Sequence, residues 1–249
     1  MDLYEAFISS VPAHLRVRMA VRGRYQAYVE TEGGAGLASL PLPGKKPYGD
    51  AVVCTDWLGR PLRDLAAQLG SEDMALSALG CAAVNAWFNR RESMEALGVT
   101  LYPPEIDEGD VFRTLEPECA GKIVSTVGHF HGGEKLAGMR ELRVFEREPR
   151  PGDYPEWEED RLIPGSDVVV ITGMALTNGT MLHILELCHN SEIVALSGPS
   201  VPVSPIWFDY GVTALFGTLC WDISGCRKAA RCGGHKDTWK YMGKSVLRK

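Results

Sequence analysis

The sequence lacks a long apolar run. No uninterrupted stretch approaches the roughly 20 apolar residues that a membrane-spanning helix needs, so no membrane span is predicted. The opening residues, M-D-L-Y-E, carry acids where a secretory signal carries bases, a pattern typical of a cytoplasmic protein. With 45% hydrophobic and 23% charged residues among 249, the chain is typical of a globular protein with room for two domains.

A paired set of cysteines is also missing. The seven cysteines are odd in number and scattered, which favours reduced, mostly buried thiols in a reducing compartment over a disulfide framework. The last three, with His235, read C-x5-C-x5-C-x2-H, which is not a zinc-binding spacing. Residues six apart lie on different faces of a helix, so Cys226 and Cys232 are not expected to converge. Buried thiols are predicted here, and metal ligation by this segment is the alternative.

Two catalytic signatures are absent. After the strand expected over residues 122–127, the turn reads V-G-H-F-H-G-G, which lacks the full G-x-G-x-x-G of dinucleotide-binding proteins. No G-x-S-x-G elbow surrounds Ser200, so a nucleophilic serine is not predicted. No other pair of nucleophile and base stands out, and whether the protein is an enzyme stays open.

Taken as a whole, the chain before the C-terminal segment lacks a net positive charge. From Gly225 onward there are eight Lys or Arg residues against the single Asp237, so this segment carries a charge of +7. The whole chain carries −6, which leaves −13 for the remainder. No aromatic interleaving or nucleic-acid motif accompanies the basic segment, so nucleic acid is not a predicted partner. A solvated strand and helix face is favoured over a site for an acidic partner.

The first hundred residues predict a small α+β domain. Apolar and polar residues alternate over residues 15–22, which is typical of a half-buried strand, and Gly23 offers a turn. The expected strands cover residues 15–22, 25–30, 36–42 and 51–57. A helix is expected from an N-cap at Ser71 to about Arg91. Pro103-Pro104 and the acidic run after them predict a linker over residues 101–120, between domains at 1–100 and 121–249.

The second domain is predicted to be Rossmann-like, built on a parallel sheet. The β-branched runs Val168–Thr172 and Ile193–Leu196 flank a segment whose apolar residues recur at helical spacing, which indicates a strand, helix, strand unit. Continuous apolar runs suit parallel strands that are buried on both faces. Further expected elements are strands over 122–127, 142–145 and 214–221, a helix opened by Gly132-Gly133, and a helix over 223–231. Together they predict an open parallel sheet of about five strands.

Polar loops follow these strands and form the candidate site. Ligands of parallel sheets bind beyond the carboxyl ends of the strands, so these loops are expected to line a cleft for a small anion or cofactor. Asn178 alternatively caps a helix, and Gly198 and Pro199 alternatively only shape the backbone. The predicted ligand-binding or cofactor-binding residues are Gly128, His129, Glu146, Thr177, Asn178, Gly179, Thr180, Gly198, Pro199 and Ser200.

Two histidines and an acid form the candidate metal site. His129 and His131 are two residues apart, so in an extended loop both imidazoles face the same way and would share a divalent or heavy metal ion with Glu146 or a cysteine. The alternative is one solvent-facing and one packed histidine. Glu146 also lies 18 residues after Gly128, close to the spacing at which an acid binds a ribose hydroxyl. An enzyme that uses an adenosine-type cofactor such as S-adenosylmethionine is therefore the alternative function.

Several longer runs carry a family resemblance. They are D-V-V-V-I-T-G-M-A-L-T-N-G-T, S-G-P-S-V-P-V-S-P-I-W-F-D-Y-G-V-T-A-L-F-G, D-V-F-R-T-L, K-I-V-S-T-V-G-H-F and G-C-A-A-V-N-A-W, which contains Asn85. From about Leu15 to Leu247, the chain resembles the family described as "putative heavy-metal chelation". The resemblance implies a Rossmann-like C-terminal domain joined to a first domain similar to the enolase N-terminal domain. It also implies a protein that holds a heavy metal, a metal chelate or a small anion between the domains.

Overall fold

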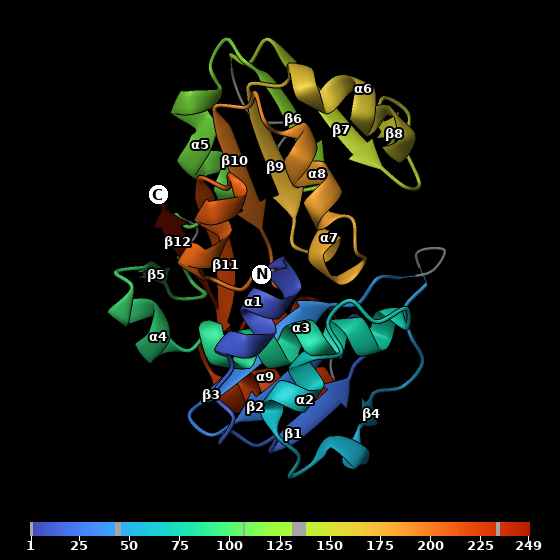
Figure 1. The fold of residues 1–249 in the computed structure, drawn as a ribbon, viewed down its shortest axis with the longest axis vertical. Coiled ribbons are helices and arrows are strands. Elements are labelled where there is room, and N and C mark those ends of the chain that lie inside the picture. The colour runs from blue at the N-terminus through green and yellow to red at the C-terminus, as the bar shows by residue number, and fades with distance from the viewer. Residues whose placement is uncertain (1, 43–45, 107, 131–137, 233–234) are drawn as a thin grey trace.

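Two β-sheets are stacked along the long axis of the molecule (Figure 1). The computed structural model describes residues 2–42, 46–106, 108–130, 138–232 and 235–249. A four-stranded antiparallel sheet, here called the small sheet, is followed by an eight-stranded, mostly parallel sheet, the large sheet. This confirms the predicted α/β class, with a small α+β part ahead of a parallel sheet. Within the described ranges, no helix has the length and apolarity to cross a membrane.

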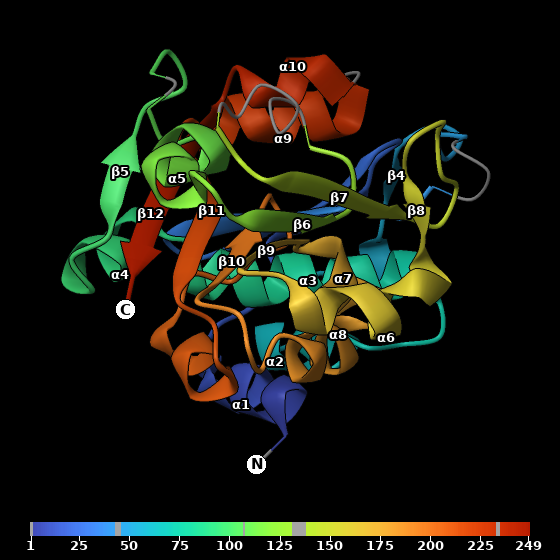
Figure 2. The same cartoon turned by 90° about the horizontal axis from the view of Figure 1, so that it is seen from above.

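The small sheet is covered on both faces. Its strands, in the order β3-β2-β1-β4, are β1 (Met19–Arg22), β2 (Gln26–Thr31), β3 (Gly34–Ser39) and β4 (Val52–Val53). Ala27 and Val29 pack with the helix α3 (Met74–Phe88), whereas Tyr28 packs with α9 (Ile223–Cys232) on the opposite side (Figure 2). Only the strand over residues 15–22 was expected to be half-buried, and in β1 Ala20 packs with α3 and Val21 with α9, so this strand is corrected to one covered on both faces. The second covering helix comes from the far end of the chain.

This part of the molecule also contains α1 (Leu3–Ser10), a 3-10 turn (Thr55–Trp57), α2 (Leu62–Ala66) and α4 (Arg91–Ala96). Two of the expected elements, the helix α3 and the strand over 51–57, differ from the sequence prediction. The N-cap of α3 is Asp73, not Ser71, because the Asp73 carboxylate accepts the amides of Ala75 and Leu76 at 2.9 and 3.1 Å. The strand expected over 51–57 is only the short β4, because the 3-10 turn follows it.

Close packing of β3 against α3 depends on Gly36. A Cβ at Gly36 would lie 2.2 Å from the Ala82 carbonyl oxygen and 2.3 Å from the Ala86 amide nitrogen, both in the backbone of α3. We expect Gly36→Ala to lower the free energy of unfolding by about 1–3 kcal/mol, because strand and helix must move apart. Urea denaturation measures this. In the control Gly49→Ala, where the added Cβ meets open space, the change should stay within about 0.5 kcal/mol. Equal effects in both variants would argue against this packing.

The large sheet runs in the order β5-β12-β11-β10-β9-β6-β7-β8. Its strands are β5 (Thr100–Tyr102), β6 (Ile123–Val127), β7 (Glu141–Glu146), β8 (Tyr154–Pro155), β9 (Val168–Thr172), β10 (Ile193–Ser197), β11 (Ala214–Cys220) and β12 (Met242–Arg248). Strands β6 to β11 pair in parallel, and β12 pairs antiparallel with both β11 and β5. The chain proceeds outward from β6 to β8 in one direction and from β9 to β11 in the other. The switch point therefore lies between β6 and β9, where parallel sheets bind ligands.

Helices cover both faces of the large sheet. Helix α5 (Val111–Cys119) packs with Val168 and Val170 on one face. On the other face lie α6 (Glu159–Leu162), α7 (Met174–Thr177) and α8 (Met181–Leu187), with 3-10 turns at Glu156–Glu158, Ile163–Gly165 and Pro205–Tyr210 (Figure 1). Helix α10 (His235–Trp239) follows α9. The helix expected after Gly132-Gly133 lies outside the described residues.

The division into domains at 1–100 and 121–249 stays a prediction. In the structure, β5 and α5 both pack into the large sheet, although the sequence places most of them in a linker over 101–120. In the opposite direction, α9 packs on the small sheet. Each sheet therefore packs with elements that the sequence had assigned elsewhere: β5 and α5 with the large sheet, and α9 with the small sheet.

Candidate functional site

The strands β9 and β10 point toward the small sheet, and the loops after them meet α3 (Figure 1). The Asn85 side-chain amide donates to the carbonyl oxygens of Leu37 and Pro199 at 2.8 and 2.9 Å. The Ser200 hydroxyl accepts the Ser39 amide at 2.9 Å, and Ser200 is 1% exposed. Pro199 and Ser200 thus lie in a buried contact between the two parts of the molecule.

Asn89, which caps the C-terminal end of α3, makes the same kind of contact. Its side-chain amide donates to the carbonyl oxygens of Val201 and Thr218, both at 2.9 Å, and its oxygen accepts the Val203 amide at 2.8 Å. At the start of α3, the Ser77 hydroxyl donates to the Thr177 carbonyl oxygen at 2.7 Å. We call this set the joint: Ser77, Asn85 and Asn89 of α3 with Thr177 and residues 198–203.

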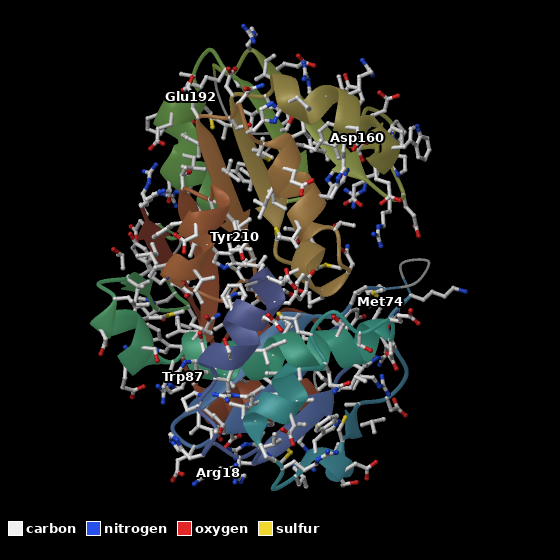
Figure 3. The ribbon with its side chains drawn as sticks, in the orientation of Figure 1. Arg18, Met74, Trp87, Asp160, Glu192 and Tyr210 are labelled. Atoms are coloured by element: carbon white, nitrogen blue, oxygen red, sulfur yellow. The ribbon has the colours of Figure 1, made fainter. Side chains whose placement is uncertain are left out.

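A cavity of about 470 Å³ opens beside the joint. It lies at the carboxyl ends of β6, β7 and β9, next to the switch point of the large sheet. The first part of the chain contributes Met74, which Figure 3 shows at the beginning of α3, where the two parts meet. We call this cavity the cleft. Its lining residues are Pro41, Leu42, Met74, Val127, Gly128, His129, Phe145, Glu146, Arg147, Glu148, Glu156, Glu159, Thr172, Met174, Ala175, Asn178 and Thr180.

The structure brings only some of the sequence-predicted site residues into the cleft. Those that line it are Gly128, His129, Glu146, Asn178 and Thr180. Those outside its described lining are Thr177, Gly179, Gly198, Pro199 and Ser200. All of these except Gly179 belong to the joint, because the first part of the chain covers the end of β10. His131, a predicted metal ligand, lies outside the described residues.

The loop after β6 is held by hydrogen bonds. Gly128 has a φ of +96°, a conformation that favours glycine, and leads into His129. The His129 amide donates to Glu146 Oε1, and His129 Nε2 lies within hydrogen-bond distance of Asp153 Oδ2, both at 2.8 Å. Burial acts to raise the pKa of Asp153, but hydrogen bonds from the Arg150 amide and the His129 ring outweigh it and lower that pKa. His129 and Glu146 are therefore fixed in orientation at the ends of neighbouring strands.

One wall of the cleft is acidic. Glu146, Glu148, Glu156 and Glu159 line it, against Arg147 and His129. Arg147 Nε donates to Glu156 Oε2 at 2.8 Å. Burial, reinforced by the charge of Glu156, raises the pKa of Glu159 to about 7. An excess of carboxylates in a confined space attracts cations and repels small anions.

Carboxylate oxygens, which hard metal cations prefer as ligands, line the cleft. Among the described residues, no group of three or more His, Cys, Asp and Glu side chains is arranged to hold a metal ion. His129 Nε2 faces Asp153, so this nitrogen would have to leave its hydrogen bond before it could bind a metal. The available donors are the glutamates of the acidic wall, with the thioethers of Met74 and Met174 also on the lining.

Sequence reasoning missed most of the acidic wall. Glu148, Glu156 and Glu159 come from a segment without a recognisable motif, and only the folding of α6 beside β7 brings them together. The signal present was the density of acids in E-W-E-E-D. Met74 lies in the helix expected between Ser71 and Arg91, and nothing in its sequence context indicated a site residue.

A mostly parallel sheet with an open cavity at its switch point defines an α/β protein with a ligand site beyond the strand ends. The sequence comparison then gives the family. The chain belongs to the family described as "Putative heavy-metal chelation", whose pattern matches residues 110–249, and a second pattern with the same description matches residues 4–88. The resemblance found in the sequence is confirmed. The likeness of the first part to the enolase N-terminal domain stays a prediction.

Relatives span most of the chain. An uncharacterized protein of Methanocaldococcus jannaschii is 26% identical over 201 residues, which are 78% of this chain and 74% of that protein. A crystal structure of a family member of unknown function from Desulfitobacterium hafniense is similar with a TM-score of 0.84 at 26% identity, covering 99% of this chain and 97% of that one. Another, from Pyrococcus horikoshii, has a TM-score of 0.77 at 19% identity, covers 99% and 98%, and shows the fold alone.

Proposed function

We propose that the cleft binds a positively charged, metal-bearing ligand, with the metal as cargo. The observation that carries this proposal is the acidic wall of the cleft, where four glutamates face a cavity of about 470 Å³ between the two parts of the molecule. A water molecule occupies about 30 Å³, so this volume suits a metal held by an organic chelator better than a bare ion. The family description points to the same chemistry.

The charges of the lining support a division of roles. Glu146 and Glu159 would attract the cargo and supply oxygen donors, since carboxylates bind metal cations. The apolar side chains of Leu42, Phe145 and Met174 would contact the organic part of the ligand. The metal itself would supply positive charge and open coordination positions to these carboxylates.

A free small anion, the other ligand expected from the sequence, is disfavoured. The acidic wall repels anions. In addition, Asn178 Oδ1 accepts both the amide and the hydroxyl of Thr180, at 3.1 and 2.8 Å. Asn178 therefore shapes a turn before α8, and the predicted helix cap is corrected, because the N-cap of α8 is Thr180.

Removal of charge from the wall tests the proposal. A thermal-shift screen of divalent ions, alone and with small chelators, identifies the best ligand, since a ligand at 100 times its Kd stabilises by about 2.7 kcal/mol. The double variant Glu146→Gln with Glu159→Gln keeps hydrogen-bond acceptors and, at pH 8, above the pKa of Glu159 of about 7, loses two charges. We expect its affinity for that ligand, measured by calorimetry, to fall by about tenfold to a hundredfold. Glu116→Gln on α5 is the control, and equal affinity in all three proteins would refute binding at this wall.

A second candidate is an enzyme that uses S-adenosylmethionine. It is favoured by one observation, the position of Glu146 at the end of β7 beside the turn at Gly128, where an acid binds ribose hydroxyls in Rossmann-like proteins. The sulfonium charge of this cofactor also suits an acidic wall. Equilibrium dialysis with S-adenosylmethionine and S-adenosylhomocysteine distinguishes this function, because the metal-cargo proposal predicts no binding of either compound in metal-free buffer.

A further inference from the structure

A pair of thiols lies outside the cleft, between β11 and α9. Cys220 ends β11, and Cys226 lies in the first turns of α9. Cys220 packs against the apolar cluster that contains Cys226, and the two thiols lie close enough for each to influence the ionisation of the other. The sequence analysis compared only Cys226 with Cys232, which lie on one helix. In the structure, Cys226 instead lies near Cys220, because a short turn connects the end of β11 to the start of α9.

The turn between the two cysteines is fixed by a single carbonyl group. The Tyr241 carbonyl oxygen accepts the amides of Trp221 and Asp222 at 2.9 and 3.1 Å, and also the Cys226 thiol at 3.3 Å. The Cys226 amide donates to the Asp222 carbonyl oxygen at 2.9 Å, which begins the helix. The thiol pair is therefore held by the fold and does not depend on exposed loops.

The surroundings of the pair are apolar. Cys226 is buried and Cys220 is half-buried, in the cluster that α9 forms with the small sheet. Arg227 and Glu30 neutralise each other through two contacts of 2.7 Å, and the Asp222 carboxylate in the turn accepts the Gly225 amide at 3.0 Å. The neighbouring Cys226 thiol, together with burial, raises the pKa of the Cys220 thiol. An apolar site of this kind disfavours any metal ion whose complex with the two thiolates carries a net charge.

We propose that Cys220 and Cys226 form a second metal site, for a soft divalent cation that binds two thiolates, such as Hg²⁺. On binding, two S–H bonds break, two sulfur–metal bonds form, and both protons leave to solvent without any change of oxidation state. The product is a neutral dithiolate, which suits an apolar site. Monovalent soft cations would leave a negative charge, and Zn²⁺ requires four ligands.

The test uses the reduced, full-length protein. It is incubated with an equivalent of Hg²⁺ and an excess of 2-mercaptoethanol, desalted, and analysed for metal by mass spectrometry. The competitor removes Hg²⁺ from isolated cysteines, whereas two thiolates in one site act at high effective concentration. We expect the wild type to retain the metal, and Cys220→Ser and Cys226→Ala each to weaken retention by at least about tenfold. X-ray absorption should show two sulfur ligands.

Two controls make the result decisive. Cys232→Ser removes an exposed thiol from the same helix, and Cys54→Ser removes one from another part of the chain, so both should retain the metal as the wild type does. Cys220 is only half-buried, so its serine variant should unfold cooperatively, and Cys226→Ala provides a second, independent variant. Undiminished retention in both variants, or release by the wild type, overturns the proposal. Neither outcome concerns the cleft, whose glutamates are tested separately.

Discussion

Asn89→Ala is expected to lower the free energy of unfolding by about 3 kcal/mol or more, among the largest effects of any single substitution in this chain. The Asn89 side chain is 3% exposed and makes three hydrogen bonds, to Val201, Thr218 and Val203. Truncation removes all three hydrogen bonds, and each buried polar group that loses its partner costs about 1–3 kcal/mol. Urea denaturation at neutral pH measures the change.

Two further variants separate the buried amide from a general effect of asparagine loss. Asn190→Ala removes an exposed amide with one long contact of 3.5 Å, so it should change stability by no more than about 0.5 kcal/mol. Asn89→Asp keeps the size and the acceptor but loses both donated hydrogen bonds, so it should destabilise at least as strongly as alanine. If Asn89→Ala proved as mild as Asn190→Ala, the joint would not hold the two parts together as described.

Stability is expected to fall as pH rises from about 4.5 to 7, because of Glu159. Burial and the charge of Glu156 raise the pKa of Glu159 to about 7 from 4.5, while the positive charges of His183 and Arg147 oppose this and Asp160 adds to it. Between these pH values the folded protein retains a proton that the unfolded chain has lost, so deprotonation favours unfolding. Above pH 7 the contribution is fully lost.

Glu159→Gln isolates this effect. The amide does not ionise, so the variant should show a shallower decline across the same pH window and gain stability relative to the wild type at pH 8. Denaturation midpoints at a series of pH values give the comparison, with Glu116→Gln as a charge-matched control that should follow the wild-type profile. Parallel profiles for Glu159→Gln and wild type would show that Glu159 is not buried in its neutral form.

The strands that carry the cleft could be predicted from the sequence. Val168–Thr172 is found with the predicted bounds, and Ile193–Ser197 extends the predicted strand by one residue, because β-branched runs in a doubly covered sheet have a clear pattern. The rule that parallel sheets bind ligands beyond the carboxyl ends of their strands also led to the prediction that Gly128 and Glu146 are site residues. Both line the cleft.

The joint could not be predicted, because it depends on contacts between distant residues. Pro199 is 114 residues from Asn85, and nothing local to either residue indicates the hydrogen bond between them. The same holds for the packing of α9 on the small sheet and for the presence of Glu146 and Glu159 in the lining of one cleft. Sequence patterns define elements and their buried faces, but the partner that covers a face or a strand end is decided by tertiary packing.

Anomalous X-ray diffraction from crystals grown with the best metal ligand tests the binding of metal cargo in the cleft most directly. The ion or chelate with the largest thermal shift is used, and data are collected at the absorption edge of its metal. The proposed function predicts an anomalous peak inside the cleft, between Met74 on one side and Glu146 and Glu159 on the other. A metal peak elsewhere in the molecule, with no peak in the cleft, would contradict it.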